Sequence, residues 1–192
     1  MGTQTLNMNQ NGVLKPTRSN HFANSVFRNA HWSWLWLFLR LFVGWEWISA
    51  SWAKLHNPAW VGSNAGAALS GFINSALAKT SGAHPNVQLW YGWFLKTFVL
   101  PHTIFMSYLV TGGEFLVGAA LILGMFTGFA AFFGGFMSMN YMLAGSVSLN
   151  PILFVIEILL LFAWRSAGWL GLDRWAIPVY LRLRGGSQQN QE

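Results

Sequence analysis

The sequence predicts an all-α membrane protein, a bundle of four transmembrane helices with amphipathic helices in a long outer loop between the first and second. Charged residues make up 8% of the 192 residues, against about 25% in an ordinary soluble domain. Apolar residues reach 54%, with 12 Trp and 16 Phe. A soluble protein needs charge over its whole surface, which this composition cannot supply. Continuous apolar runs of this length do not form barrels, so a helical bundle is expected.

The chain divides into one membrane domain, residues 31–182, and two polar tails, 1–30 and 183–192, which are expected to be disordered. The first tail lacks the apolar core of a cleavable signal peptide. About 20 residues are needed to span the hydrocarbon of a bilayer. Four apolar stretches meet this length: 32–52, 103–123, 126–146 and 151–171. Short links at 124–125 and 147–150 predict that the last three are antiparallel neighbours.

The loop of residues 53–102 contains two amphipathic patterns, which predict helices that lie at the membrane surface or cap the bundle. A fifth crossing is disfavoured, because Gly82 and Pro85 interrupt the apolar run. The first pattern consists of Ala65, Leu69, Phe72, Ile73, Ala76 and Leu77, and the second, strongly aromatic one consists of Leu89, Trp90, Trp93, Phe94 and Phe98.

The distribution of Lys and Arg predicts the orientation. Six basic residues lie in or beside the two tails, and a seventh, Arg165, lies near the inner end of the fourth helix. Three lie in the long loop. Positively charged segments stay on the cytoplasmic side. The sequence therefore predicts a multi-pass protein of the cell (plasma) membrane with both termini cytoplasmic. The net charge of +6 does not indicate nucleic-acid binding, because the basic residues form no stripe or known module.

Ionisable side chains within the predicted crossings are expected to be paired or functional, since each costs about 3 kcal/mol or more in hydrocarbon. Arg40 lies twelve residues and Glu114 eleven residues from the outer ends of their helices. Both therefore fall near the midplane, and the sequence predicts that they pair. A structural role, in which the two charges neutralise each other, is one interpretation of this pair.

A second polar layer is predicted nearer the outer surface, where Glu46, Glu157 and Asn140 fall at one depth with Lys54 just above. Two carboxylates without an arginine at their level cannot both ionise cheaply, so one is expected to hold a proton near neutral pH. The alternative is that each Glu simply hydrogen-bonds a Ser, a Trp or a backbone group of another helix.

The tryptophans are typical of interfacial belts. Trp45 and Trp47 flank Glu46, however, and could also hold a flat ring between them.

Several cofactors are excluded or disfavoured. The absence of cysteine excludes thiolate-bound Fe–S clusters, cysteine-ligated haem and thiol catalysis. A haem held by two histidines is not expected, because His31 and His102 fall at opposite membrane faces. The spacing of His56, His84 and His102 matches no metal motif, so no metal site is predicted.

Three segments together resemble the DoxX/DoxD family over about residues 32–182. They are Leu-Phe-Val-Gly-Trp-Glu-Trp at 41–47 followed by Ser-Trp-Ala-Lys at 51–54; Gly-Glu-Phe-Leu-Val-Gly at 113–118 followed by Leu-Ile-Leu-Gly at 121–124; and Ala-Gly-Trp-Leu-Gly-Leu-Asp-Arg-Trp at 167–175. The resemblance implies four helices, with Glu46, Lys54 and Glu114 at the polar positions of the family. Ser51 stands where relatives often carry glycine.

The resemblance also implies an activity, because DoxD is the membrane subunit of a thiosulfate:quinone oxidoreductase, which oxidises thiosulfate to tetrathionate and reduces quinone. The first hypothesis is therefore a membrane subunit of a quinone-linked oxidoreductase. The small companion subunit of that enzyme is not in this chain, so a second oxidoreductase subunit is an expected partner. The lysines of the long loop, Lys54, Lys79 and Lys96, would attract a small anionic substrate such as thiosulfate to the outer face.

Under this hypothesis quinone is the one cofactor, and seven residues form the candidate site. The candidates for proton transfer are Glu46, Glu114 and Glu157, and the candidates for quinone binding are Arg40, Trp47, Asn140 and Lys54. The alternative hypothesis is a non-enzymatic membrane scaffold for a partner oxidoreductase. A small-solute transporter ranks third, because the inner half of the bundle offers little polar path beyond Arg165.

Overall fold

The computed structural model describes residues 7–8, 14–15, 33–168 and 170–173. From Ser33 onward every regular element of this part is a helix, which confirms the predicted all-helical class for the membrane domain. The predicted tails lie outside the described residues, except for two short strands. These are β1, Asn7–Met8, and β2, Leu14–Lys15, which pair antiparallel where the sequence predicted disorder.

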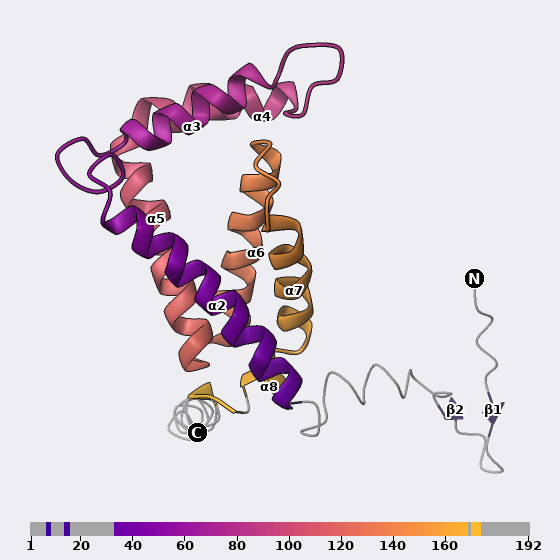
Figure 1. Ribbon diagram of the computed structural model, residues 1–192. Coiled ribbons are helices and arrows are strands. Elements are labelled where there is room, and N and C mark those ends of the chain that lie inside the picture. The colour runs from indigo at the N-terminus through magenta and orange to yellow at the C-terminus, as the bar shows by residue number, and fades with distance from the viewer. Residues whose placement is uncertain (1–6, 9–13, 16–32, 169, 174–192) are drawn as a thin grey trace, which may run out of the picture.

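Four long helices form the body of the molecule, close to the four predicted apolar stretches (Figure 1). They are α2, Ser33–Leu55; α5, Thr103–Leu123; α6, Thr127–Leu143; and α7, Asn150–Phe162. The predicted fourth helix is interrupted, because α7 ends at Phe162 and a short helix α8, Trp164–Gly168, follows after Ala163.

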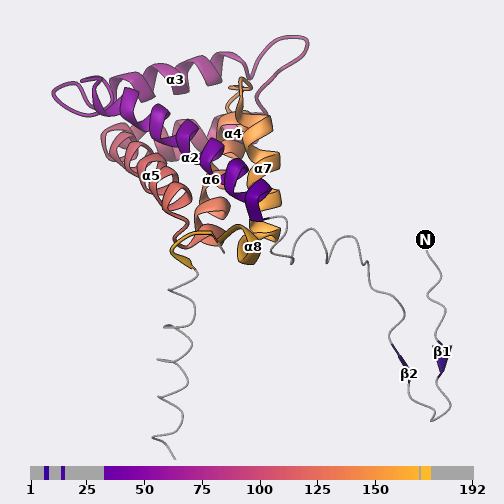
Figure 2. The same cartoon turned by 60° about the horizontal axis from the view of Figure 1, so that its bottom comes forward.

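The four long helices pack in two close pairs, α2 along α5 and α6 along α7 (Figures 1 and 2). The contact between α2 and α5 requires glycine. A Cβ atom on Gly118 would lie 2.8 Å from the carbonyl oxygen of Gly44, so a side chain at this position would force the helices apart. The core between the pairs is formed by Trp36, Val43, Trp47, Val117, Leu121, Ala130, Ala131, Leu153, Leu160, Ala163 and Ala167.

The long loop folds into an arm of two helical segments across one end of the bundle (Figure 1). Its first segment is α3, Ala67–Ala78, and its second is α4, Leu89–Phe94, continued by a π-helical turn at Leu95–Val99 and a 3₁₀ turn at Leu100–His102. The arm therefore caps the bundle, and no loop separates it from α5. A second core holds it in place, formed by Leu69, Ile73, Ala76, Val87, Tyr91, Leu95 and Ala144.

One described helical segment, Leu89–Leu123, is long and apolar enough to span a membrane by length and composition. It has 35 residues and includes the bend between the arm and α5. The helices α6 and α7 are shorter, with 17 and 13 residues. One helical segment is thus long and apolar enough to cross a membrane, while the four crossings stay a prediction.

Candidate functional site

A cavity of about 330 Å³, here called the chamber, lies beneath the arm at one end of the bundle. Helix α2 supplies Glu46, Ala50 and Lys54, which are four residues apart and therefore share one helix face. The other walls come from the arm, the link before it, α5, α6 and the start of α7. They include the aromatic residues Trp60, Phe72 and Tyr141, the carboxylate of Glu114, and the polar residues Ser146, Ser148 and Asn150, and α2 adds the ring of Trp47.

Three polar side chains from three helices meet at one carboxylate oxygen of the chamber. Lys54 Nζ forms an ion pair with Glu114 Oε1, and the hydroxyl of Tyr141 donates to the same oxygen at 2.5 Å. Lys54 Nζ also donates to the Tyr141 hydroxyl at 3.2 Å. Glu114 is completely buried, and the side chain of Lys54 is 15% exposed. The second oxygen of Glu114, Oε2, is buried without a hydrogen-bond partner.

Aromatic rings surround the ammonium group of this triad. Lys54 Nζ lies 4.9 Å from the ring centroid of Trp60 and 5.4 Å from that of Tyr141. Trp47 stacks on Tyr141 at 6.3 Å between centroids, and Phe72 meets the same ring edge-on at 6.0 Å. Cation–π attraction to two rings, added to the ion pair, stabilises the buried charge of Lys54.

The predicted pairing of Arg40 with Glu114 is wrong. Arg40 Nη1 donates to the carbonyl oxygen of Ala167 at 2.9 Å, and Nη2 donates to that of Leu170 at 3.3 Å. Counting residues gives the depth of a Cα atom, but a long side chain reaches well away from it. The side chain of Arg40 extends toward the end of the bundle at α8. The side chain of Lys54 extends into the chamber and forms the ion pair with Glu114 that was predicted for Arg40.

The surroundings of Arg40 form a second polar group, the clamp, which consists of Arg40, Gly124 and Asp173. Asp173 accepts hydrogen bonds from the backbone N–H groups of Phe126 and Thr127 at 2.6 and 3.0 Å, which caps the first turn of α6. Gly124 ends α5 with a φ of 66°, and a Cβ atom there would overlap the Arg40 guanidinium. Asp173 was not among the site residues predicted from the sequence.

The predicted cluster of Glu46, Glu157 and Asn140 does not form. Glu157 is completely buried, and its two oxygens accept from Trp47 Nε1 at 2.7 Å and from Ser138 Oγ at 2.8 Å. Glu157 therefore follows the alternative given above for the second polar layer, in which a Glu hydrogen-bonds a Trp and a Ser of other helices. Asn140 instead accepts from the Tyr91 hydroxyl at 3.0 Å, beneath the arm.

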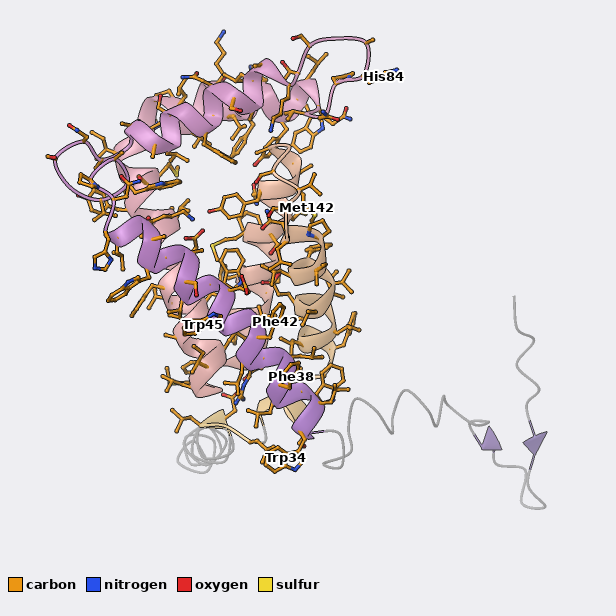
Figure 3. The ribbon with its side chains drawn as sticks, viewed as in Figure 1. Trp34, Phe38, Phe42, Trp45, His84 and Met142 are labelled. Carbon is orange, nitrogen blue, oxygen red and sulfur yellow. The ribbon has the colours of Figure 1, made fainter. Side chains whose placement is uncertain are left out.

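Glu46 lines the chamber without a fixed partner. It is half-buried, and it makes no hydrogen bond or ion pair with the described residues. The alternative in which Trp45 and Trp47 hold a flat ring between them does not fit the structure, since residues two apart in a helix point to nearly opposite sides. Trp47 is 2% exposed, whereas Trp45 is 64% exposed on the outer surface of α2 together with Trp34 and Phe38 (Figure 3).

The chamber thus brings together four predicted site residues and leaves out three. Glu46, Trp47, Lys54 and Glu114 line it; Arg40, Glu157 and Asn140 do not. The sequence missed Tyr141, although a hydroxyl within a predicted crossing is expected to find a hydrogen-bond partner.

The three lysines predicted to attract an anion have different surroundings. Lys54 is neutralised by Glu114, and Lys79 Nζ donates to the carbonyl oxygen of Gly145 at 2.9 Å. Lys96 is exposed on the arm. The three lysines therefore do not form a joint anion site.

The histidines lie apart. Nδ1 of His56 contacts its own helix at the carbonyl oxygen of Trp52, and His102 does the same at Phe98. His84 lies in the loop at the far tip of the arm (Figure 3). Within the described part of the chain, no three residues of types that bind metals are grouped to hold an ion.

Comparison with protein-family models, curated proteins and solved structures finds no match to this chain. The resemblance to the DoxX/DoxD family therefore stays a prediction. Fold and site together define a helical protein with one helical segment long and apolar enough to span a membrane and a charged, aromatic-walled chamber at one end.

Proposed function

We propose that this chain is the membrane subunit of a quinone-linked oxidoreductase and that the chamber binds the quinone headgroup. The observation that carries the proposal is the Lys54–Glu114–Tyr141 triad, which lies within aromatic walls beside Glu46. Flat rings stack well on aromatic side chains. Sites for small molecules have volumes of about 300 Å³ or more and combine apolar walls with a few polar groups. The chamber has both properties.

The proposal includes four membrane crossings, by α2, α5, α6 and α7. In α5, α6 and α7 the charged residues among those described are Glu114 and Glu157, and both are completely buried. The outer faces carry large apolar residues instead, which suits contact with lipid. Examples from the three helices are Phe105, Leu109, Leu116, Phe129, Phe132, Phe136, Ile152, Val155 and Phe162.

The chamber residues would transfer protons to the quinone, and would not carry electrons. A bound quinone accepts two electrons and two protons, and two thiosulfate ions that form one tetrathionate release two electrons. The electrons come from thiosulfate directly or through a second subunit, because the chain has no cysteine to hold an Fe–S cluster. Glu46, half-buried in the chamber, exchanges protons with the outside, and Tyr141, whose hydroxyl donates to Glu114, holds a proton next to the ring.

A solute transporter is disfavoured by the opposite end of the bundle. There the Arg40 guanidinium fills the space between α5 and the segment after α8, with Gly124 and Gly171 in direct contact. A path from the chamber through the bundle would have to displace this group.

Quinone reduction by membranes that contain the protein and its electron donor tests the activity. We expect Glu114→Gln and Glu46→Gln to lower the rate at least tenfold, with Glu192→Gln, the same change at the last residue of the sequence, as the control. Unchanged rates in both chamber variants would remove these residues from the mechanism. Co-purification of quinone or of a second protein in mild detergent tests the same proposal without an assumed donor.

The topology can be tested cleanly because the natural chain has no cysteine. Single cysteines replace Ser63 in the exposed link before α3, and Ser19 and Ser187 in the two tails. A membrane-impermeant maleimide added to intact cells should label the first site alone. Labelling of a tail without permeabilisation would contradict cytoplasmic termini.

A further inference from the structure

The charged side chains of the chamber leave mostly hydrogen-bond acceptors free. Glu114 Oε1 is already used twice, by Lys54 and by Tyr141, but Glu114 Oε2 is buried without a partner. Neither oxygen of Glu46 is bonded to a described residue. Three carboxylate oxygens are therefore unused. A buried acceptor without a partner costs about 1 to 3 kcal/mol, which a ligand that supplies a donor would recover.

The donors of the same charged group are nearly used up. The ammonium group of Lys54 has three N–H bonds, of which one goes to Glu114 and one to Tyr141. The Tyr141 hydroxyl donates to Glu114, and the indole N–H of Trp47 donates to Glu157, outside the chamber. The charged side chains of the chamber thus have one free donor, an N–H of Lys54, and three free acceptors, the carboxylate oxygens.

The net charge of the chamber's side chains also disfavours an anionic ligand. The charged side chains of the chamber are Lys54, Glu46 and Glu114, one positive and two negative. Once Lys54 and Glu114 have paired, Glu46 is left without a counter-charge among the described residues. A small anion in this chamber would meet an unpaired carboxylate at a few ångströms, where like charges in a partly buried site repel strongly.

We propose that the chamber binds its ligand through hydrogen-bond donors of the ligand, so that it takes the reduced quinol in preference to the oxidised quinone and rejects small anions such as thiosulfate. This inference rests on the proposed function. A quinol carries two hydroxyl donors, which match Glu114 Oε2 and the carboxylate of Glu46. A quinone carries carbonyl acceptors, for which the charged triad offers a single N–H. Thiosulfate oxidation would then take place outside the chamber, on another subunit.

Preferential binding of the quinol has a measurable redox consequence. A ligand that binds one redox state tenfold more tightly shifts a two-electron potential by about 30 mV. Tighter binding of the quinol therefore makes the bound quinone a stronger oxidant, which helps it to take electrons from a weak donor.

The test compares three ligands of one shape on the purified full-length protein in mild detergent under argon. They are a short-chain ubiquinone, its quinol, and the quinol with both hydroxyls methylated, and their dissociation constants are measured by calorimetry. We expect the quinol to bind at least tenfold more tightly than the quinone or the methylated compound. Thiosulfate at millimolar concentration should not compete with the quinol.

Two variants assign the preference to the carboxylates. Glu46→Gln and Glu114→Gln exchange one acceptor oxygen for an N–H donor and should each reduce the quinol preference to threefold or less, while Glu192→Gln keeps it. Quinone binding that equals or exceeds quinol binding, or equal binding of the methylated quinol, overturns this inference but leaves the proposed function standing. If none of the three ligands binds, the proposed function fails and the inference fails with it.

Discussion

Two cations on α2, the partly buried Lys54 in the chamber and the buried Arg40 in the clamp, have opposite surroundings. Arg40 donates to two backbone carbonyl oxygens in a filled space, where Gly124 leaves no room for a Cβ atom. Lys54 meets a carboxylate beside a cavity of about 330 Å³, with an acceptor oxygen of Glu114 left unpaired. A buried charge is therefore a candidate for function only where an open space and an unused hydrogen-bonding group lie beside it.

The largest effect on stability is expected at the clamp. Replacing Arg40 by leucine removes the donor from two carbonyl oxygens, those of Ala167 and Leu170, and removes a positive charge that attracts Asp173. Losing one side of such a buried polar group costs about 3 to 5 kcal/mol. The free energy of unfolding is measured by denaturant titration in mixed micelles.

Lys79 provides the matched control for Arg40. It also donates to a backbone carbonyl oxygen, that of Gly145, but to one only, and it is half-buried. Lys79→Leu should therefore cost about 1 kcal/mol. If both variants lose the same stability, the clamp has no special role.

The second effect concerns the ion pair of the chamber. Lys54→Met leaves the completely buried Glu114 without its cation and should cost about 3 kcal/mol. Glu114→Gln costs less, because Lys54 borders a cavity that can hold water. The double variant should be more stable than the sum of the single effects predicts, by about 1 to 3 kcal/mol. A coupling of zero in this double-mutant cycle would show that the two charges do not interact.

Much of the fold follows from the sequence because helix length and apolar periodicity are local properties. The bounds of α2, α5 and α6 agree with the predicted stretches to within a few residues, and the two amphipathic patterns of the loop do form helices. The break between α7 and α8 was not predicted. In that region the apolar run continues through Trp164, so hydropathy gave no signal for the end of the helix.

The site was predicted only in part, because its geometry depends on how far side chains reach and which way they point. Depth counting paired Arg40 with Glu114, but the long stem of Lys54 reaches the same carboxylate from the end of α2. Glu157 was placed with Glu46, yet it faces Ser138 and Trp47. Residue order along a helix does not reveal these choices, since they depend on the packing of α2 against α6 and α7.

A smaller effect is expected from Asp173, whose carboxylate caps α6. Asp173→Asn keeps one acceptor but turns an amide N–H₂ toward a backbone N–H, so one of the bonds to Phe126 or Thr127 is lost. Loss of a helix cap costs about 1 kcal/mol. As a control, Asn57→Ala removes an exposed hydrogen bond to Ala59 and should change stability by less than about 0.5 kcal/mol.

The smallest effect on stability is expected at Glu46, where the chemical change is the same as at Asp173. Glu46→Gln should leave the free energy of unfolding within about 0.5 kcal/mol of the natural value, since the carboxylate is half-buried and bonds no described residue. The same denaturant titration measures it beside Asp173→Asn. A loss as large as that of the Asp173 variant would mean that Glu46 supports the fold. A stable Glu46 variant with weakened quinol binding would instead assign the free carboxylate of the chamber to its ligand.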